Sequence, residues 1–150
     1  MPGRRGCYDP RRMDGLHLIA DLRGCTGPVP LDDLDALRTL CLRAVAESGL
    51  RAVGEVFHPF VDADGRPQGV TGVVLLAESH VALHTWPELD AVTADAYVCN
   101  FGVDNTARAE ALMARLVEAF APASCALQRV RRGEPEDGAP ARGGVRSYPT

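Results

Sequence analysis

The chain has 150 residues, of which 46% are apolar and 24% are charged, and its formal net charge at pH 7 is −4. This length and balance are typical of one globular domain with a buried core, and the negative charge gives no electrostatic reason to expect nucleic acid. No apolar run reaches the roughly 18 residues that a membrane span needs, and the arginine-rich start lacks the apolar core of a secretory signal. We therefore expect a cytoplasmic protein with no membrane partner.

The numbers of lysine and cysteine residues limit which cofactors and cross-links the chain can have. All 16 basic residues are arginine, so no lysine amine is available to hold pyridoxal phosphate or to form an enzyme-derived Schiff base. The five cysteines are odd in number, scattered and never spaced as CxxC, which favours free thiols over a disulfide framework.

The first third of the chain predicts an arm, a strand and a helix. Residues 1–14 carry four arginines among glycine and proline without periodicity, so we expect a flexible arm. Alternation over 16–21 predicts a strand, in which His17 is expected to be a half-buried strand histidine. An apolar stripe from Leu34 to Val45 predicts an amphipathic helix that follows two aspartates and ends at Ser48-Gly49.

Strands dominate the middle of the chain. Alternation over 51–57 predicts a second strand running on to Phe60, and the Asp-Gly and proline breakers over 61–69 predict a turn. The almost continuous apolar run over 70–77 is typical of a strand covered on both faces. Alternation over 92–101 predicts a further strand.

The last third predicts a helix over 106–120 with capping residues before it and Pro122 after it, then a closing strand over 124–130. Residues 131–150 are rich in glycine, proline and charge, so we expect a disordered tail. The element order and short connections predict a single domain over 15–130 of the α/β class, α+β type. Its expected form is a two-layer sandwich with a largely antiparallel sheet and two helices on one face.

The stretch 78–88 concentrates reactive groups, because it holds two of the four histidines and the only tryptophan. Ser79 follows Glu78, His84 stands five residues later and Cys99 twenty residues later, which supplies a nucleophile, bases and an acid. On a straight strand Ser79 and His84 would point to opposite faces. We therefore predict a turn or bulge at 78–80, between two strands, that brings them together.

This motif, Glu-Ser-His followed by His84-Thr85-Trp86-Pro87-Glu88 and then Cys99, resembles the small prokaryotic S-adenosylmethionine decarboxylase proenzymes over about residues 15–130. The resemblance implies that Ser79 attacks the carbonyl of Glu78, that the chain cleaves itself between them, and that Ser79 becomes a pyruvoyl group. Such a carbonyl can take over the electron-sink role of pyridoxal phosphate, which agrees with the absence of lysine.

The resemblance also implies roles for other side chains. Thr71 and His84 would assist processing, and Cys99 would be the proton donor in decarboxylation. Glu88 would contact the ribose of the substrate and Phe60 would stack on its adenine. The resemblance further implies that two processed units form a homodimer. It also implies that the reaction serves polyamine, and thus spermidine, biosynthesis.

Several alternatives stay open at this point. The chain departs from the family pattern at Tyr97-Val98-Cys99-Asn100 and Leu89-Asp90-Ala91, so ornithine or arginine could be the substrate instead. A non-catalytic homologue acting as a partner subunit is a further possibility. A zinc site of His80, His84 and Cys99 lacks the usual ligand spacing, so no metal is expected.

Overall fold

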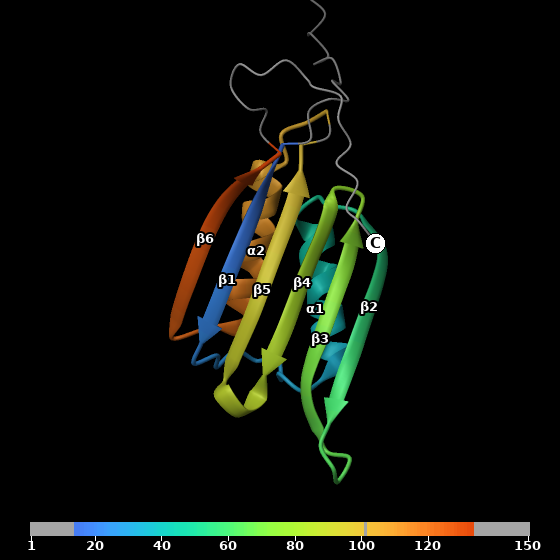
Figure 1. The fold of residues 1–150 in the computed structure, drawn as a ribbon, viewed down its shortest axis with the longest axis vertical. Coiled ribbons are helices and arrows are strands. Elements are labelled where there is room, and N and C mark those ends of the chain that lie inside the picture. The colour runs from blue at the N-terminus through green and yellow to red at the C-terminus, as the bar shows by residue number, and fades with distance from the viewer. Residues whose placement is uncertain (1–13, 101, 134–150) are drawn as a thin grey trace, which may run out of the picture.

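The computed structural model describes residues 14–100 and 102–133, which form six strands, two α-helices and one short 3-10 helix (Figure 1). The elements in chain order are β1 (Gly15–Arg23), α1 (Leu34–Glu47), β2 (Ala52–Val61), β3 (Pro67–Leu76), β4 (Ser79–Trp86), η1 (Pro87–Leu89), β5 (Ala91–Cys99), α2 (Thr106–Phe120) and β6 (Ser124–Arg132).

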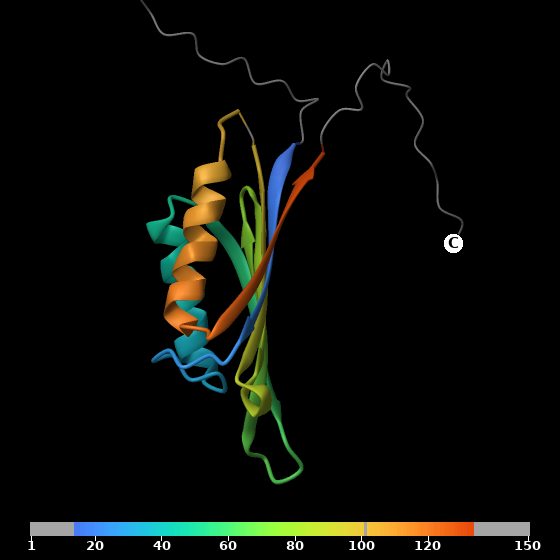
Figure 2. The same ribbon diagram turned by 90° about the vertical axis from the view of Figure 1, so that its left-hand side faces the viewer.

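All six strands join one antiparallel sheet in the order β2-β3-β4-β5-β1-β6. Both helices lie on the same face of this sheet, as Figure 2 shows from the side. The predicted two-layer α+β architecture is confirmed. No helix in the described part of the chain is long and apolar enough to cross a membrane.

Local signals explain where the helices begin and end. The Asp33 carboxylate accepts a hydrogen bond from the Ala36 amide at 3.0 Å, which caps the first turn of α1. Gly49, with φ 76°, then reverses the chain after α1. At the other helix, Asn105 is the N-cap residue of α2, and Ala121 ends α2 in the left-handed region with φ 44°.

The core lies between the sheet and the helices. Every second residue of β1 and β5 points to this side, and α2 contributes a stripe that ends at Phe120, the largest fully buried side chain. Because each strand turns alternate residues to the helices, its other residues lie on the opposite face of the sheet, which we call the open face.

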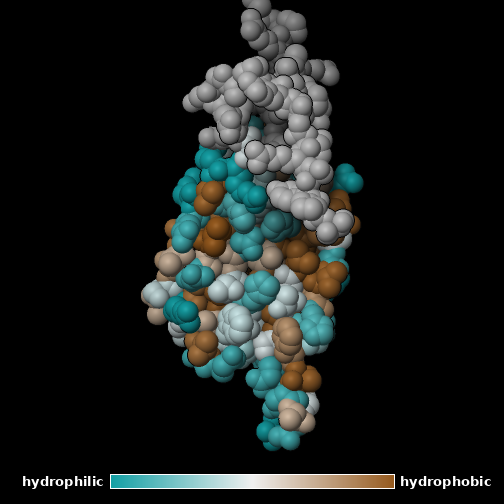
Figure 3. Space-filling view, viewed as in Figure 1, coloured by the Kyte–Doolittle hydropathy of each residue, from teal (hydrophilic) through white to brown (hydrophobic). Residues whose placement is uncertain are grey.

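The open face carries apolar side chains as well as polar ones (Figure 3). On the β2–β3 side Val56 and Leu75 remain 63% and 48% exposed. The prediction that residues 70–77 form a strand covered on both faces is therefore wrong for the single chain. Only the helix side of β3 is covered, since the described chain places no second layer over the open face.

Other differences from the predicted elements are small, except for one. The stretch 79–86 is itself a regular strand, β4, which raises the five strands of the predicted order to six. β3 begins at Pro67 rather than at residue 70, and β6 continues to Arg132, past the predicted end of the domain. The predicted arm and tail lie outside the described residues, apart from residue 14 and residues 131–133.

Candidate active site

Ser79 lies directly after the two-residue turn that joins β3 to β4. Its backbone has φ 140°, a region that residues with a side chain rarely adopt. Conformations of this kind cost about 1–3 kcal/mol each and collect at functional sites. The turn predicted at 78–80 is present but lies at residues 77–78, so Ser79 is already the first residue of β4 and is held there under strain.

Cys99 contacts this turn through both its side chain and its backbone. Its thiol Sγ lies 3.0 Å from Ser79 Oγ, and either atom can be the donor. Its backbone N–H donates a 2.8 Å hydrogen bond to the carbonyl oxygen of Glu78. A donor on that oxygen polarises the carbonyl next to the Ser79 hydroxyl and stabilises negative charge that develops there. We call Glu78, Ser79 and Cys99 the cleavage half-site.

Residues that the sequence analysis did not single out hold Cys99 in place. The buried Asn105 side chain donates from Nδ2 to the Cys99 carbonyl at 2.8 Å, and its own backbone N–H donates to Asn100 Oδ1 at 2.8 Å. The sequence signal that could have identified Asn105 was its place as a helix-capping residue. Asn105 is only six positions after Cys99, so the start of the helix lies close to the end of the strand that carries Cys99.

Tyr97 also borders the cleavage half-site, two residues before Cys99 on the same face of β5. A hydrogen bond between its hydroxyl and the Cys99 thiol, with partial burial, raises the pKa of Tyr97. The hydroxyl therefore stays protonated at neutral pH.

Four other predicted site residues gather at the opposite end of β4. Thr71 Oγ1 lies 3.1 Å from His84 Nδ1 across the β3–β4 pair. Both line a cavity of about 330 Å³ together with Phe60 and Glu88. We call these four residues the pocket half-site.

The two half-sites are far apart within one chain. Ser79 and His84 stand at opposite ends of a regular strand that pairs without interruption with β3 and β5. Five residues of strand span about 16 Å, several times the reach of a hydrogen bond. The prediction that the turn brings Ser79 and His84 together is therefore wrong, because the chain straightens immediately after Ser79.

The zinc alternative of His80, His84 and Cys99 is not assembled either. His80 Nε2 contacts Asp95 and His84 Nδ1 contacts Thr71, while the Cys99 thiol faces Ser79. The described residues contain one group with the spacing of metal ligands, and that group joins His80 to His17 and Asp95.

The fold and site together define a two-layer α+β protein in which a strained serine at a hairpin turn is held against a thiol. A sequence model described as S-adenosylmethionine decarboxylase matches residues 16–133, and the chain belongs to this family.

Individual relatives agree with this assignment. An S-adenosylmethionine decarboxylase proenzyme of Carboxydothermus hydrogenoformans is 41% identical over 90 residues, which are 60% of this chain and 66% of the relative. The proenzyme of Pelotomaculum thermopropionicum is 39% identical over 85 residues, 57% of this chain and 63% of the relative. The matched stretch thus spans just under two thirds of each of these curated relatives.

A solved structure extends the likeness to the fold. The crystal structure of the adenosylmethionine decarboxylase from Aquifex aeolicus matches with a TM-score of 0.72 and 32% identity. The match covers 86% of this chain and 98% of that chain.

Proposed function

We propose that this chain is a self-processing, pyruvoyl-dependent carboxy-lyase that decarboxylates S-adenosylmethionine for polyamine, and thus spermidine, biosynthesis. The observation that carries the proposal is the cleavage half-site. A strained serine hydroxyl adjoins a carbonyl that already accepts a hydrogen bond from the Cys99 backbone. Relatives named S-adenosylmethionine decarboxylase proenzyme support the substrate.

The first reaction is cleavage of the chain itself. Ser79 Oγ attacks the carbonyl carbon of Glu78, a C–O bond forms, and the C–N bond to Ser79 breaks as its nitrogen takes a proton. The Cys99 N–H stabilises the oxyanion at Glu78, and strain at Ser79 offsets part of the amide resonance that resists attack. Loss of the Ser79 Cα proton then breaks the bond between Ser79 Cβ and its ester oxygen and releases residues 1–78 with Glu78 as a free carboxylate. Water finally hydrolyses the remaining dehydroalanine, its nitrogen leaves as ammonia, and residue 79 becomes a pyruvoyl group.

The residues around Ser79 fit such a group. The pyruvoyl carbonyl supplies an electron sink for amino-acid decarboxylation, a role that a chain without lysine cannot give to pyridoxal phosphate. The Cys99 thiol, 3.0 Å from Ser79 Oγ and only 8% exposed, lies where a proton donor is needed after carbon dioxide leaves.

The pocket half-site is proposed to bind the nucleoside part of the substrate. Its cavity combines the exposed aromatic ring of Phe60 with the carboxylate of Glu88, and these groups suit stacking on a base and hydrogen bonding to ribose hydroxyls. Thr71 and His84, joined by their hydrogen bond, are proposed to assist proton transfer in processing.

The separation of the half-sites favours a homodimer of processed units. Two copies related by a twofold axis with their open faces together can place the cleavage half-site of one copy against the pocket half-site of the other. Exposed apolar side chains on this side of the molecule, with Phe60 49% and Trp86 45% exposed, would be covered in such a dimer.

We also propose a cytoplasmic location, which fits the thiol chemistry. The four cysteines within the described residues, Cys25, Cys41, Cys99 and Cys125, are free, as is usual in a reducing compartment.

The processing proposal is tested by intact mass and N-terminal analysis of the purified protein. The wild type should give fragments 1–78 and 79–150, the second with a blocked, carbonyl-containing terminus, and Ser79→Ala should remain full length. Ser124→Ala, a change at an exposed serine on β6, is the matched control and should cleave normally. A wild-type chain that stays intact after long incubation would instead indicate a non-catalytic homologue.

The substrate is tested separately, because Tyr97 and Asn100 flank Cys99 where the family pattern has other residues. Carbon dioxide release from S-adenosylmethionine, ornithine and arginine should be measured side by side with processed protein. We expect release from S-adenosylmethionine. Faster release from ornithine or arginine would assign the same pyruvoyl chemistry to that amino acid.

A further inference from the structure

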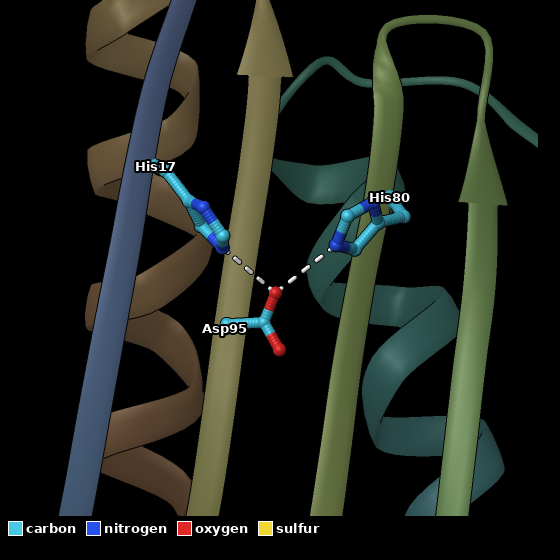
Figure 4. A group of neighbouring side chains, drawn as sticks. All are labelled: His17, His80 and Asp95. Carbon is cyan, nitrogen blue, oxygen red and sulfur yellow. Dashed lines mark hydrogen bonds and ion pairs between the residues drawn. The ribbon is translucent and has the colours of Figure 1, made fainter. Parts of the chain in front are cut away.

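A second cluster of chemically active side chains, which shares no residue with either half-site, lies on the open face; Figure 4 shows its three members, His17, His80 and Asp95. Asp95 Oδ2 is 2.9 Å from His17 Nε2 and 3.0 Å from His80 Nε2. The three ligand atoms all lie within 4.8 Å of one another, and the reaction proposed above assigns a task to none of the three residues.

The sheet fixes this cluster by its register. β5 lies between β1 and β4, and both His17 and His80 pair with Tyr97. Asp95 is two residues from Tyr97 and therefore points to the same face, between the two imidazoles. Three neighbouring strands in a continuous antiparallel ladder thus hold the side chains, so that the group is preformed rather than gathered from mobile loops.

The donor atoms match a transition metal. Two imidazole nitrogens and one carboxylate oxygen form a common three-ligand set for Zn²⁺ and related divalent ions, with a remaining position for water. The side chains of His17, His80 and Asp95 are only 17%, 34% and 29% exposed, so the site is partly shielded from solvent. Within the described residues, the two imidazoles both contact the Asp95 carboxylate at Oδ2.

We propose that His17, His80 and Asp95 form a binding site for one divalent transition metal ion of the Zn²⁺ type. The ion ties β1, β4 and β5 together beside the turn that carries Ser79. This site is independent of the decarboxylase proposal, since a chain that neither cleaves nor decarboxylates would still bind the ion.

Binding of the ion would change which nitrogen of each imidazole carries the hydrogen, and this change can be measured. Without an ion, the Nε2 atom of each imidazole is the donor to Asp95 Oδ2, because a carboxylate oxygen only accepts; in the neutral tautomer that fits this contact, Nδ1 is an acceptor. A metal bound at Nε2 moves that hydrogen to Nδ1. Arg132, whose NH1 lies 3.4 Å from His17 Nδ1, can only donate, so it must leave His17 when the ion binds. Its guanidinium also stacks on Tyr97, 4.6 Å from the ring centroid, a contact that does not require the one with His17.

The direct test is calorimetric titration of the metal-free protein, with residues 1–150 all present whether or not the chain is cleaved, with Zn²⁺ at about pH 8, where protons compete only weakly with metal ions for their ligands. One ion per copy of residues 1–150 should bind. His17→Ala and Asp95→Asn should each weaken binding at least 10-fold, roughly the loss that removing even an outer partner of a ligand causes. His58→Ala, which removes an open-face imidazole that contacts Phe60 rather than the cluster, is the matched control. Equal affinity in all four proteins would overturn the proposal and assign the ion to the thiols or to the remaining surface.

Two further measurements do not depend on the folding of the ligand variants. Long-range ¹H–¹⁵N spectra of the wild type should show Zn²⁺ shifting the Nε2 signals of two of the four histidines, and shifts confined to His58 or His84 would refute the assignment. Arg132→Gln should bind Zn²⁺ several-fold more tightly than the wild type, because an amide oxygen can accept the Nδ1 hydrogen. Unchanged or weaker binding in that variant would contradict coordination through Nε2.

Discussion

Two inactive variants should restore activity when they pair, if the active site is shared between two chains. Ser79→Ala lacks the nucleophile and His84→Ala lacks a member of the pocket half-site. In a single chain these positions are about 16 Å apart along β4, whereas direct proton transfer needs donor and acceptor about 3 Å apart. His84 can therefore act on Ser79 only from a second copy.

The expected magnitude follows from counting sites. A heterodimer of the two variants has one site with Ser79 and His84 both intact and one site with both replaced. Heterodimer isolated through two different affinity tags should show about half the wild-type rate of carbon dioxide release per dimer, and an untagged random mixture about one quarter. The two homodimers, assayed alone, give the background.

Cleavage should follow the same rule. In the heterodimer the His84→Ala chains should be cleaved, which mass spectrometry can follow because Ser79→Ala chains stay intact. If the isolated heterodimer is no more active than the two homodimers, the active site is not shared between two chains. Failure to recover any heterodimer or homodimer would refute the dimer itself.

Three other changes probe single interactions. Cys99→Ala keeps the backbone N–H on the Glu78 carbonyl, so we expect cleavage to proceed while decarboxylation falls; unimpaired turnover would exclude the thiol as proton donor. Thr85→Val should lower the free energy of unfolding in urea by about 1–3 kcal/mol, because Thr85 Oγ1 accepts from the buried Val70 amide at 2.8 Å; an unchanged urea midpoint would show that this amide needs no partner. Burial raises the pKa of Cys41 from 9.0 to about 12, so the folded protein keeps a proton that the unfolded chain loses. Stability should therefore fall from about pH 9 to pH 12 by up to about 4 kcal/mol, and Cys41→Val should flatten this dependence.

Local features of the fold could be predicted because nearby residues determine them. Asp33 caps α1 and Gly49 ends it, as the sequence indicates, and the turn before Ser79 lies within one or two residues of its predicted position. Apolar alternation placed the strands to within a few residues, because each strand turns one face to the helices.

The arrangement of the site could not be predicted in the same way. The predicted turn at 78–80 was expected to bring Ser79 and His84 into a single catalytic centre, although His80, Ala82 and His84 alternate with apolar residues as in a strand. Whether Ser79 meets His84 depends on β4 pairing with both β3 and β5, which only the assembled sheet determines. Likewise, His17 and Asp95 are 78 positions apart in the sequence, and no local pattern joins them.

The strand order has a consequence for the cleaved protein. Cleavage after Glu78 would divide the sheet β2-β3-β4-β5-β1-β6 between two polypeptides, with β1, β2 and β3 on one and β4, β5 and β6 on the other. The fragments would interlock, since β1 lies between β5 and β6 of the other fragment. Separating them would break three strand pairs at once, and after denaturation two free chains would have to find each other again. The proenzyme would thus fold as one molecule at any dilution, whereas the mature protein would refold only in a concentration-dependent reaction.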